Sequence, residues 1–167
     1  MKARPRPLFL VAAINLALIA HAPGARADPP RIGDPAPPLD LPGEHDSRVS
    51  LLPNQVNVVD FYATWCGPCQ QAMTALDAIG RALGWRFHLI VVDVDEDPAI
   101  VSHKPVPDRA TLAFDRDSSA ARRWGQTRFP TTFIVDEHNI IRRINRGYGS
   151  GYETRLRIWL KALLPAQ

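Results

Sequence analysis

The chain has 167 residues, a formal net charge of +3 and two cysteines. This length predicts one domain with a core of ordinary size. The first 27 residues carry no acid and four basic side chains, those of Lys2, Arg4, Arg6 and Arg26. Residues 28–167 therefore have a net charge of −1 and no long run of like charge, so nucleic acid is not an expected partner.

The first 27 residues predict a secretory signal peptide. A basic start is followed by a thirteen-residue apolar run, Leu8 to Ala20, and by Ala25-Arg26-Ala27, which has the form of a cleavage site. The run is shorter than the roughly 18 to 20 residues that span a membrane. We expect a periplasmic or otherwise extracytoplasmic domain over residues 28–167; the alternative is a domain tethered by an uncleaved signal anchor.

Extended structure dominates the chain before the cysteines. The stretch from Asp28 to Pro38 is proline-rich and predicts an extended lead-in. Residues 39–41 and 49–51 flank a turn-rich segment and predict a β-hairpin. Val56 to Tyr62 is nearly continuous in β-branched and aromatic residues, which predicts a strand buried on both faces.

Helices and strands alternate after the cysteines. Apolar residues at three- and four-residue steps predict a helix that ends at Gly84, and residues 85–94 predict a strand. The remaining expectations are a short helix from Pro98 to Ser102, a strand at 111–114, a helix capped by Asp117 or Ser118 and ended by Gly125, antiparallel strands at 131–135 and 140–145, and a last helix opened by a capping box from Ser150 to Glu153. This order predicts an α/β fold, a mixed sheet covered by helices.

Both cysteines lie in Trp65-Cys66-Gly67-Pro68-Cys69, at the junction of a strand and a helix. The free N–H groups and dipole of a helix N-terminus favour an anion, so a thiol there becomes acidic. We expect Cys66 to be the exposed nucleophile and Cys69, one turn further in, to resolve the mixed disulfide. Pro68 pre-organises the first turn, and Gly67 leaves space for a partner's backbone.

Two other roles for the cysteines fit less well. A structural bridge that closes only two residues removes little chain entropy. A zinc site needs two further ligands, whereas there is no second cysteine pair and the histidines are scattered singly. Reversible dithiol chemistry, with no metal and no cofactor besides the Cys66–Cys69 disulfide, is the expectation.

Asp60 and Pro130 are the other candidate site residues. Asp60 is an acid in an otherwise apolar strand, where burial would raise its pKa and let it accept a proton from Cys69. The alternative is a solvated acid at a strand end. Phe129-Pro130 is an X-Pro bond, the usual home of a cis peptide, and a proline that opens a strand leaves a backbone edge for an extended substrate.

Two segments together resemble the thioredoxin superfamily, and within it the TlpA/ResA-like extracytoplasmic thioredoxins. Residues 60–69 are similar to the family's catalytic segment, and residues 129–136 to its cis-proline strand. The resemblance implies a thioredoxin fold with an N-terminal hairpin extension and a central β-α insertion. It also implies that Trp65 shields the site, with substrate contacts at Trp65, Gly67, Pro68, Phe129 and Thr131. Many relatives carry asparagine at the position of Asp60, glutamate at Ala72 and proline at Thr74.

The expected function is that of an exported enzyme that reduces disulfides in extracytoplasmic proteins, in cytochrome c maturation or copper-centre assembly. Its partners would be protein disulfides and a thiol-type electron donor in the membrane, and the chain would act as a monomer. One alternative is the reverse chemistry, a disulfide oxidase or isomerase. Another is a copper-binding chaperone on the same fold, with His103 or His138 as a further ligand.

Overall fold

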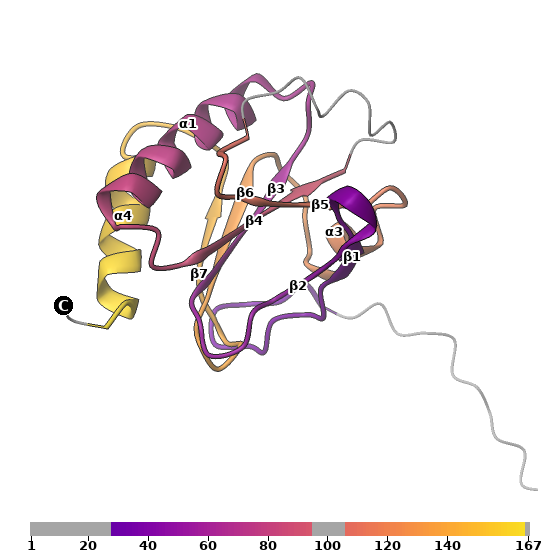
Figure 1. Cartoon of the computed structure of the whole chain (residues 1–167), viewed down its shortest axis with the longest axis horizontal. Coiled ribbons are helices and arrows are strands. Elements are labelled where there is room, and N and C mark those ends of the chain that lie inside the picture. Colours follow the sequence, from indigo (N-terminus) through magenta and orange to yellow (C-terminus); the bar gives the residue numbers. More distant parts are fainter. Residues whose placement is uncertain (1–27, 95–105, 166–167) are drawn as a thin grey trace, which may run out of the picture.

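The computed structural model describes residues 28–94 and 106–165 (Figure 1). The expected signal peptide, the expected helix from Pro98 to Ser102, and His103 lie outside the described residues. The fold places the dithiol and the cis-proline at the same edge of one central sheet, as follows from the strand order and register.

The sheet has five strands in the order β5-β4-β3-β6-β7. Their bounds are β3 Asn57–Tyr62, β4 His88–Asp93, β5 Thr111–Phe114, β6 Thr131–Val135 and β7 Ile141–Arg146. Strands β3, β4 and β5 are parallel, whereas β6 and β7 are antiparallel to their neighbours. Because β6 runs opposite to β3 and pairs Thr131 with Phe61, the start of β6 lies beside the end of β3.

Two helices cover one face of the sheet, and the hairpin with a short helix covers the other (Figure 1). Helices α1 (Gly67–Ala82) and α4 (Tyr152–Leu163) pack over the helix-side core, which includes Val58, Tyr62 and Leu76. Helix α3 (Ser119–Arg123) and the hairpin of β1 (Asp40–Pro42) and β2 (Arg48–Ser50) enclose the hairpin-side core. The expected thioredoxin fold with an N-terminal hairpin is confirmed.

Aromatic rings fill the hairpin-side core. Phe61 of β3, Phe133 of β6 and Trp124 after α3 are fully buried, and their ring centroids are 5.0 to 5.9 Å apart in tilted or edge-to-face arrangements. Such pairs add about 0.5–1.5 kcal/mol each beyond the burial of their surface. The three rings therefore fasten the two central strands to the segment after α3.

The proline-rich lead-in is paired with the end of the sheet. The Gly33 N–H donates to Ile141 O at 2.8 Å, the Ile141 N–H to Asp34 O at 3.0 Å, and the Ala36 N–H to Asn139 O at 2.8 Å. Prolines lack an N–H, so these bonds fall on the other residues of the segment. The pairing covers the start of the outer edge of β7, at Ile141, which would otherwise expose free backbone groups.

Two expected helix starts differ in detail. The capping box from Ser150 to Glu153 is wrong, because Gly151 is the N-cap of α4 at φ 75° and no side chain caps it. Of the two expected caps of α3, Asp117 accepts the Ser119 N–H at 3.0 Å, whereas Ser118, the N-cap residue, makes no cap bond through its side chain. The buried Asp115 carboxylate, which was not expected to cap, accepts the N–H groups of Ala120 and Ala121 at 3.0 and 2.7 Å.

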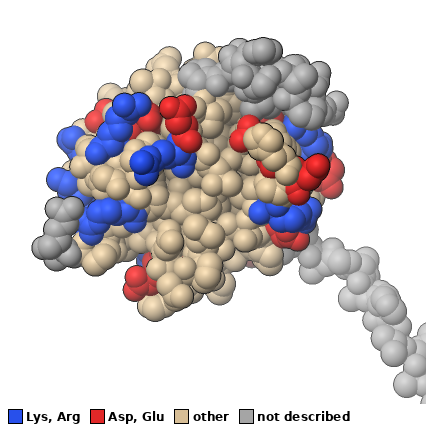
Figure 2. Space-filling model, viewed as in Figure 1, with Lys and Arg blue, Asp and Glu red and all other residues tan. Residues whose placement is uncertain are grey.

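Charged side chains of both signs are interspersed on the face shown in Figure 2. They gather at its two sides, and the middle of the face is uncharged. Asp77 and Arg81 form an i,i+4 ion pair on α1, at 2.8 Å. This face carries no broad patch of a single sign that would attract a polyanion.

Gly84 and Gly125 end helices α1 and α3 as the sequence predicts, at φ of 62° and 63°. A Cβ at Gly84 would meet no atom within 4 Å, whereas one at Gly125 would lie 2.4 Å from Cβ of Pro29 in the lead-in. An alanine at either position would thus adopt an unfavourable left-handed backbone conformation, and only at Gly125 would its Cβ also collide with a neighbour.

We predict that Gly84→Ala lowers the free energy of unfolding by about 1 kcal/mol, the cost of a left-handed alanine. Gly125→Ala should lower it by about 1–3 kcal/mol more, since the lead-in must move. Urea denaturation of both variants in the oxidised state measures the difference. Equal losses would show that the contact with Pro29 contributes nothing.

Candidate active site

The two cysteines form a disulfide at the N-terminus of α1, with their Cα atoms 5.2 Å apart. Cys66 is the N-cap residue, and its Sγ accepts the Cys69 N–H at 3.2 Å. A helix N-terminus that already directs an N–H at the sulfur stabilises a Cys66 thiolate once the disulfide is reduced. The local sequence produces this geometry, because Pro68 fits the first turn and leaves no donor unpaired.

The exposure of the two sulfur-bearing residues is unequal. Cys69 is 0% exposed and Cys66 only 6%. The expectation of an exposed Cys66 is wrong in the oxidised state, because the residue is held against the helix-side core. It remains the more accessible of the two, and Trp65, Gly67 and Pro68 around it are exposed. A substrate can therefore reach Cys66 but not Cys69.

The cis-proline segment lies beside the dithiol. The Phe129–Pro130 bond is cis, which the sequence left open. The Phe129 ring meets the Trp65 ring edge to face, with centroids 5.4 Å apart, although residues 65 and 129 are far apart in sequence. Trp65 is 70% exposed, so this aromatic pair presents an apolar surface next to Cys66.

Thr131 and Thr132 open strand β6 and point to opposite faces of the sheet. Thr131 was an expected substrate contact, but its side chain is buried, and its hydroxyl donates to Arg128 O at 2.6 Å. The hydroxyl is therefore hydrogen-bonded to the loop before the cis-proline. Thr132 instead donates to Asp60 Oδ1 at 2.6 Å across the β3–β6 pairing.

Asp60 is 0% exposed at the centre of β3, so the alternative of a solvated acid is wrong. Burial raises the pKa of its carboxyl to about 7, and the hydrogen bond from Thr132 partly opposes that rise. Asp60 Oδ2 has no hydrogen-bond partner in the described residues. Asp60 lies on the same face of β3 as Val58 and Tyr62. These two residues belong to the helix-side core together with Cys66 and Cys69, so the Asp60 carboxyl is on the side of the sheet that carries the dithiol.

Thr132 and Tyr152 are site residues that the sequence reasoning missed. The Tyr152 hydroxyl, at the start of α4, lies 2.8 Å from the Thr132 hydroxyl, and both side chains are buried. Thr132 could have been found as a polar residue that faces inward on the strand paired with β3, directly opposite Asp60. Recognising it requires the β3–β6 register, which a single sequence does not supply.

Metal-binding side chains do not gather here. No group of three His, Cys, Asp or Glu side chains able to hold a metal occurs among the described residues. His138 lies in the turn between β6 and β7, beyond the Val135 that pairs with Asn57 at the start of β3. That turn is at the opposite end of the sheet from Cys66, so His138 cannot join the thiols as a copper ligand.

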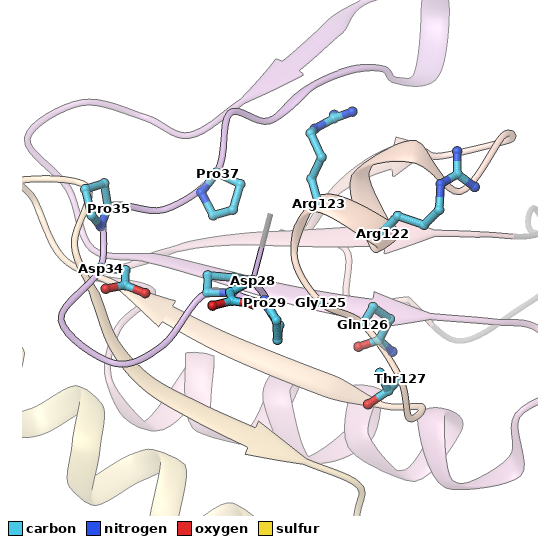
Figure 3. Close-up of a pocket in the computed structure, with 11 residues that line it drawn as sticks. Asp28, Pro29, Asp34, Pro35, Pro37, Arg122, Arg123, Gly125, Gln126 and Thr127 are labelled. Atoms are coloured by element: carbon cyan, nitrogen blue, oxygen red, sulfur yellow. The ribbon is translucent and has the colours of Figure 1, made fainter. Parts of the chain in front are cut away.

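A groove elsewhere on the surface is formed by the lead-in and α3 (Figure 3). Pro29, Pro35 and Pro37 line it from the lead-in, and Arg122 and Arg123 from the helix. None of its lining residues belongs to the dithiol segment or to the Phe129–Pro130 pair. The chemistry described above therefore does not take place in this groove.

A cysteine pair of this spacing at the start of a helix, on a sheet of this topology, defines the class of thiol-disulfide oxidoreductases with a thioredoxin fold. The chain belongs to the Redoxin family, whose model matches residues 31–156.

The chain is 31% identical over 143 residues to the thiol:disulfide interchange protein DsbE of Allochromatium vinosum, covering 83% of this chain and 79% of that protein. It is 35% identical over 66 residues to a thioredoxin-like protein of Synechocystis, a match that covers 40% of this chain and only 63% of that protein.

Solved structures agree with the fold. A structure assigned to a DsbE protein of Chlorobium tepidum has a TM-score of 0.74 at 26% identity and covers 81% of this chain and 99% of its own. StoA of Bacillus subtilis shares the fold with a TM-score of 0.61 at 16% identity, over 75% of this chain and 97% of its own. The resemblance to TlpA/ResA-like proteins is thus confirmed for family and fold.

The buried carboxyl of Asp60 makes stability depend on pH. The folded-state pKa of about 7 exceeds the unfolded value of about 3.9, so only the folded protein keeps this proton between the two. Stability therefore falls as pH rises from about 4 to about 7, by roughly 4 kcal/mol in all.

We predict that Asp60→Asn removes this dependence. The variant should match the wild type near pH 4 and exceed its free energy of unfolding by up to about 4 kcal/mol at pH 8. Urea denaturation of the oxidised proteins at both pH values measures this, with Glu137→Gln, at an exposed position, as the control for loss of a carboxylate. A constant difference at both pH values would contradict a raised Asp60 pKa.

Proposed function

We propose that the protein is an exported protein-disulfide reductase that passes two electrons from the Cys66/Cys69 dithiol to disulfides of extracytoplasmic proteins. The observation that carries the proposal is the placement of Cys66 as the N-cap of α1, with the Cys69 N–H on its sulfur, beside the cis Phe129–Pro130 segment. Export rests on the leader-like residues 1–27; in the described part of the chain, every helix is too short or too polar to cross a membrane.

The first step uses Cys66. Its thiolate attacks one sulfur of a substrate disulfide, the substrate S–S bond breaks, and one substrate sulfur leaves as a thiolate while the other stays bonded to Cys66. The N-cap position favours the thiolate, which is the attacking species. Trp65 and Phe129 offer an apolar surface on which the substrate chain can lie during the attack.

The second step uses Cys69 and Asp60. The ionised Asp60 carboxylate accepts the Cys69 proton, and the Cys69 thiolate then attacks Cys66 Sγ and releases the second substrate sulfur. The substrate disulfide has been reduced and Cys66–Cys69 oxidised, the state that the structure shows. A pKa of about 7 suits this exchange, because the group can both accept and release a proton near neutral pH.

The absence of nearby basic side chains on α1 supports the reductive direction. A strongly oxidising site stabilises its reduced thiolate, for which neighbouring cations are one means. After Cys66, the first basic residue along the chain is Arg81, in the last turn of α1. With no cation on the first turns of α1 to stabilise the reduced thiolate, we expect the reduced dithiol to be a good electron donor.

The reaction also needs an electron source and a client. A thiol-type donor in the membrane would reduce the Cys66–Cys69 disulfide again, by the same exchange in reverse. Cytochrome c maturation and copper-centre assembly are the processes that we propose for the clients, with the chain acting as a monomer. Their thiols must stay reduced in an oxidising compartment, which is the task of such a reductase.

We predict that Cys69→Ser traps clients. With Cys69 gone, mixed disulfides on Cys66 cannot be resolved and should accumulate in the exporting cell as adducts that a small thiol reductant removes. Non-reducing electrophoresis and mass spectrometry of the adducts identify the partners. Cys66→Ser is the matched control, since the buried Cys69 should form none. Adducts that form equally in both variants would contradict Cys66 as nucleophile.

We further predict a reduction potential nearer the roughly −270 mV of thioredoxin than the roughly −120 mV of a strong thiol oxidase. Equilibration with glutathione buffers, followed by tryptophan fluorescence or by thiol alkylation, measures it. A potential at the oxidising end would assign the protein to disulfide formation instead.

A further inference from the structure

A chain of three buried side chains links strands β3 and β6 to helix α4. Thr132 Oγ1 lies 2.6 Å from Asp60 Oδ1 and 2.8 Å from the Tyr152 hydroxyl, and each of the three residues is at most 1% exposed. The mechanism above uses Asp60 alone, so the two hydroxyls have no assigned part in it.

The chemistry of the three groups fixes the direction of the chain. An ionised carboxylate can only accept, so the single Thr132 proton is donated to Asp60 Oδ1. Thr132 can then only accept from Tyr152, which therefore donates. Burial, in the neighbourhood of Asp60, holds the pKa of Tyr152 well above its ordinary value, so its proton is always present.

The same arrangement also fits the protonated acid. If the proton enters on Oδ2, Oδ1 still accepts from Thr132, and no hydroxyl has to turn. If it entered on Oδ1, Thr132 would have to turn its proton toward Tyr152, and the Tyr152 proton would lose its acceptor in a buried site. Oδ2 is also the oxygen with no partner in the described residues.

We propose that Thr132 and Tyr152 are positioning residues, whose one-way hydrogen-bond chain reserves Asp60 Oδ2 as the oxygen that gains and loses the proton. The use of that proton in disulfide exchange rests on the proposed function. The positioning itself does not, because it concerns only the state of Asp60.

Other ionisable groups face this site from every side. On α1 they are Cys66 and Cys69, which titrate only when their disulfide is reduced. The loop after β7 brings Tyr148, whose ring centroid is 5.0 Å from that of Tyr152. From α4 comes Arg155, which is bound to Asn145 Oδ1 at 3.0 and 3.2 Å. The strands contribute Tyr62 and Asp93, the latter paired with Arg116 at 3.2 Å. The variants below leave all of these unchanged.

The first measurement is a carboxyl-carbon NMR titration of Asp60 in the oxidised protein. Thr132→Val keeps the shape of the side chain but removes the donor that favours the ionised form, so the pKa of Asp60 should rise above about 7. Thr132→Ser keeps the hydroxyl and should restore the wild-type value. Tyr152→Phe should raise the pKa by less, because Thr132 still donates but is no longer polarised. An unchanged pKa in both Thr132→Val and Tyr152→Phe would overturn the inference.

The second measurement is the pH dependence of the rate at which Cys69 resolves a mixed disulfide between Cys66 and a model peptide thiol. Thr132→Val should slow this step at pH 7 by roughly threefold to tenfold and leave the rate at high pH unchanged, because only the ionised fraction of Asp60 changes. A purely structural role would lower the rate at every pH, and that result would also overturn the inference.

Asp60→Asn separates the two proposals. If Thr132→Val shifts the pKa but Asp60→Asn resolves mixed disulfides at the wild-type rate, the positioning stands and the proton-acceptor role of Asp60 is wrong. If Tyr152→Phe is the only variant that folds, the pKa of Asp60 in that variant decides alone. A value equal to or below that of the wild type contradicts the proposed hydrogen-bond chain.

Discussion

The burial of one carboxyl group in the middle of the sheet is the constraint on which the site depends. Asp60 is surrounded by apolar neighbours on the central strand and accepts one hydrogen bond, from Thr132. An ionised carboxylate there lacks the solvation it has in water, so the protein holds its proton up to about neutral pH. A group that costs stability when charged and exchanges its proton near pH 7 is useful for chemistry and poor for structure.

The sheet topology brings the remaining parts to the same place. A parallel β3–β4 pair ends where the chain turns into α1, and the antiparallel β6 begins at that edge. The dithiol and the cis-proline therefore meet although more than sixty residues separate them. The polar contacts of His88 with Asn57 and Thr111 lie at the opposite end, where β3 and β4 begin. One edge of the sheet thus carries the exchange chemistry, and the other carries structural hydrogen bonds.

Local patterns were sufficient to predict most of the fold. Strands β5 and β6 have the expected bounds, and the hairpin and the two helix-ending glycines follow from turn chemistry that neighbouring residues determine. The expectations that were wrong depend on contacts between residues distant in sequence, or on the backbone conformation at the start of a helix. Ser150 loses its cap because Gly151 adopts a positive φ, and Cys66 is nearly buried because the folded chain packs around it. The partners of Asp60 were missed for the same reason, since Thr132 and Tyr152 reach it only through the register of β6 and the docking of α4.

The aromatic core on the far face explains why that register is secure. Successive residues of β3 point to opposite faces, so Phe61 enters the hairpin-side core while Asp60 and Tyr62 face the helices. A slip of one residue would place the Asp60 carboxyl between Trp124 and Phe133 and turn Phe61 toward the dithiol. The edge-to-face packing of Phe61 and Trp124 on Phe133 is incompatible with that exchange. The apolar face of the sheet, which takes no part in the chemistry, thereby fixes the side on which the acid lies.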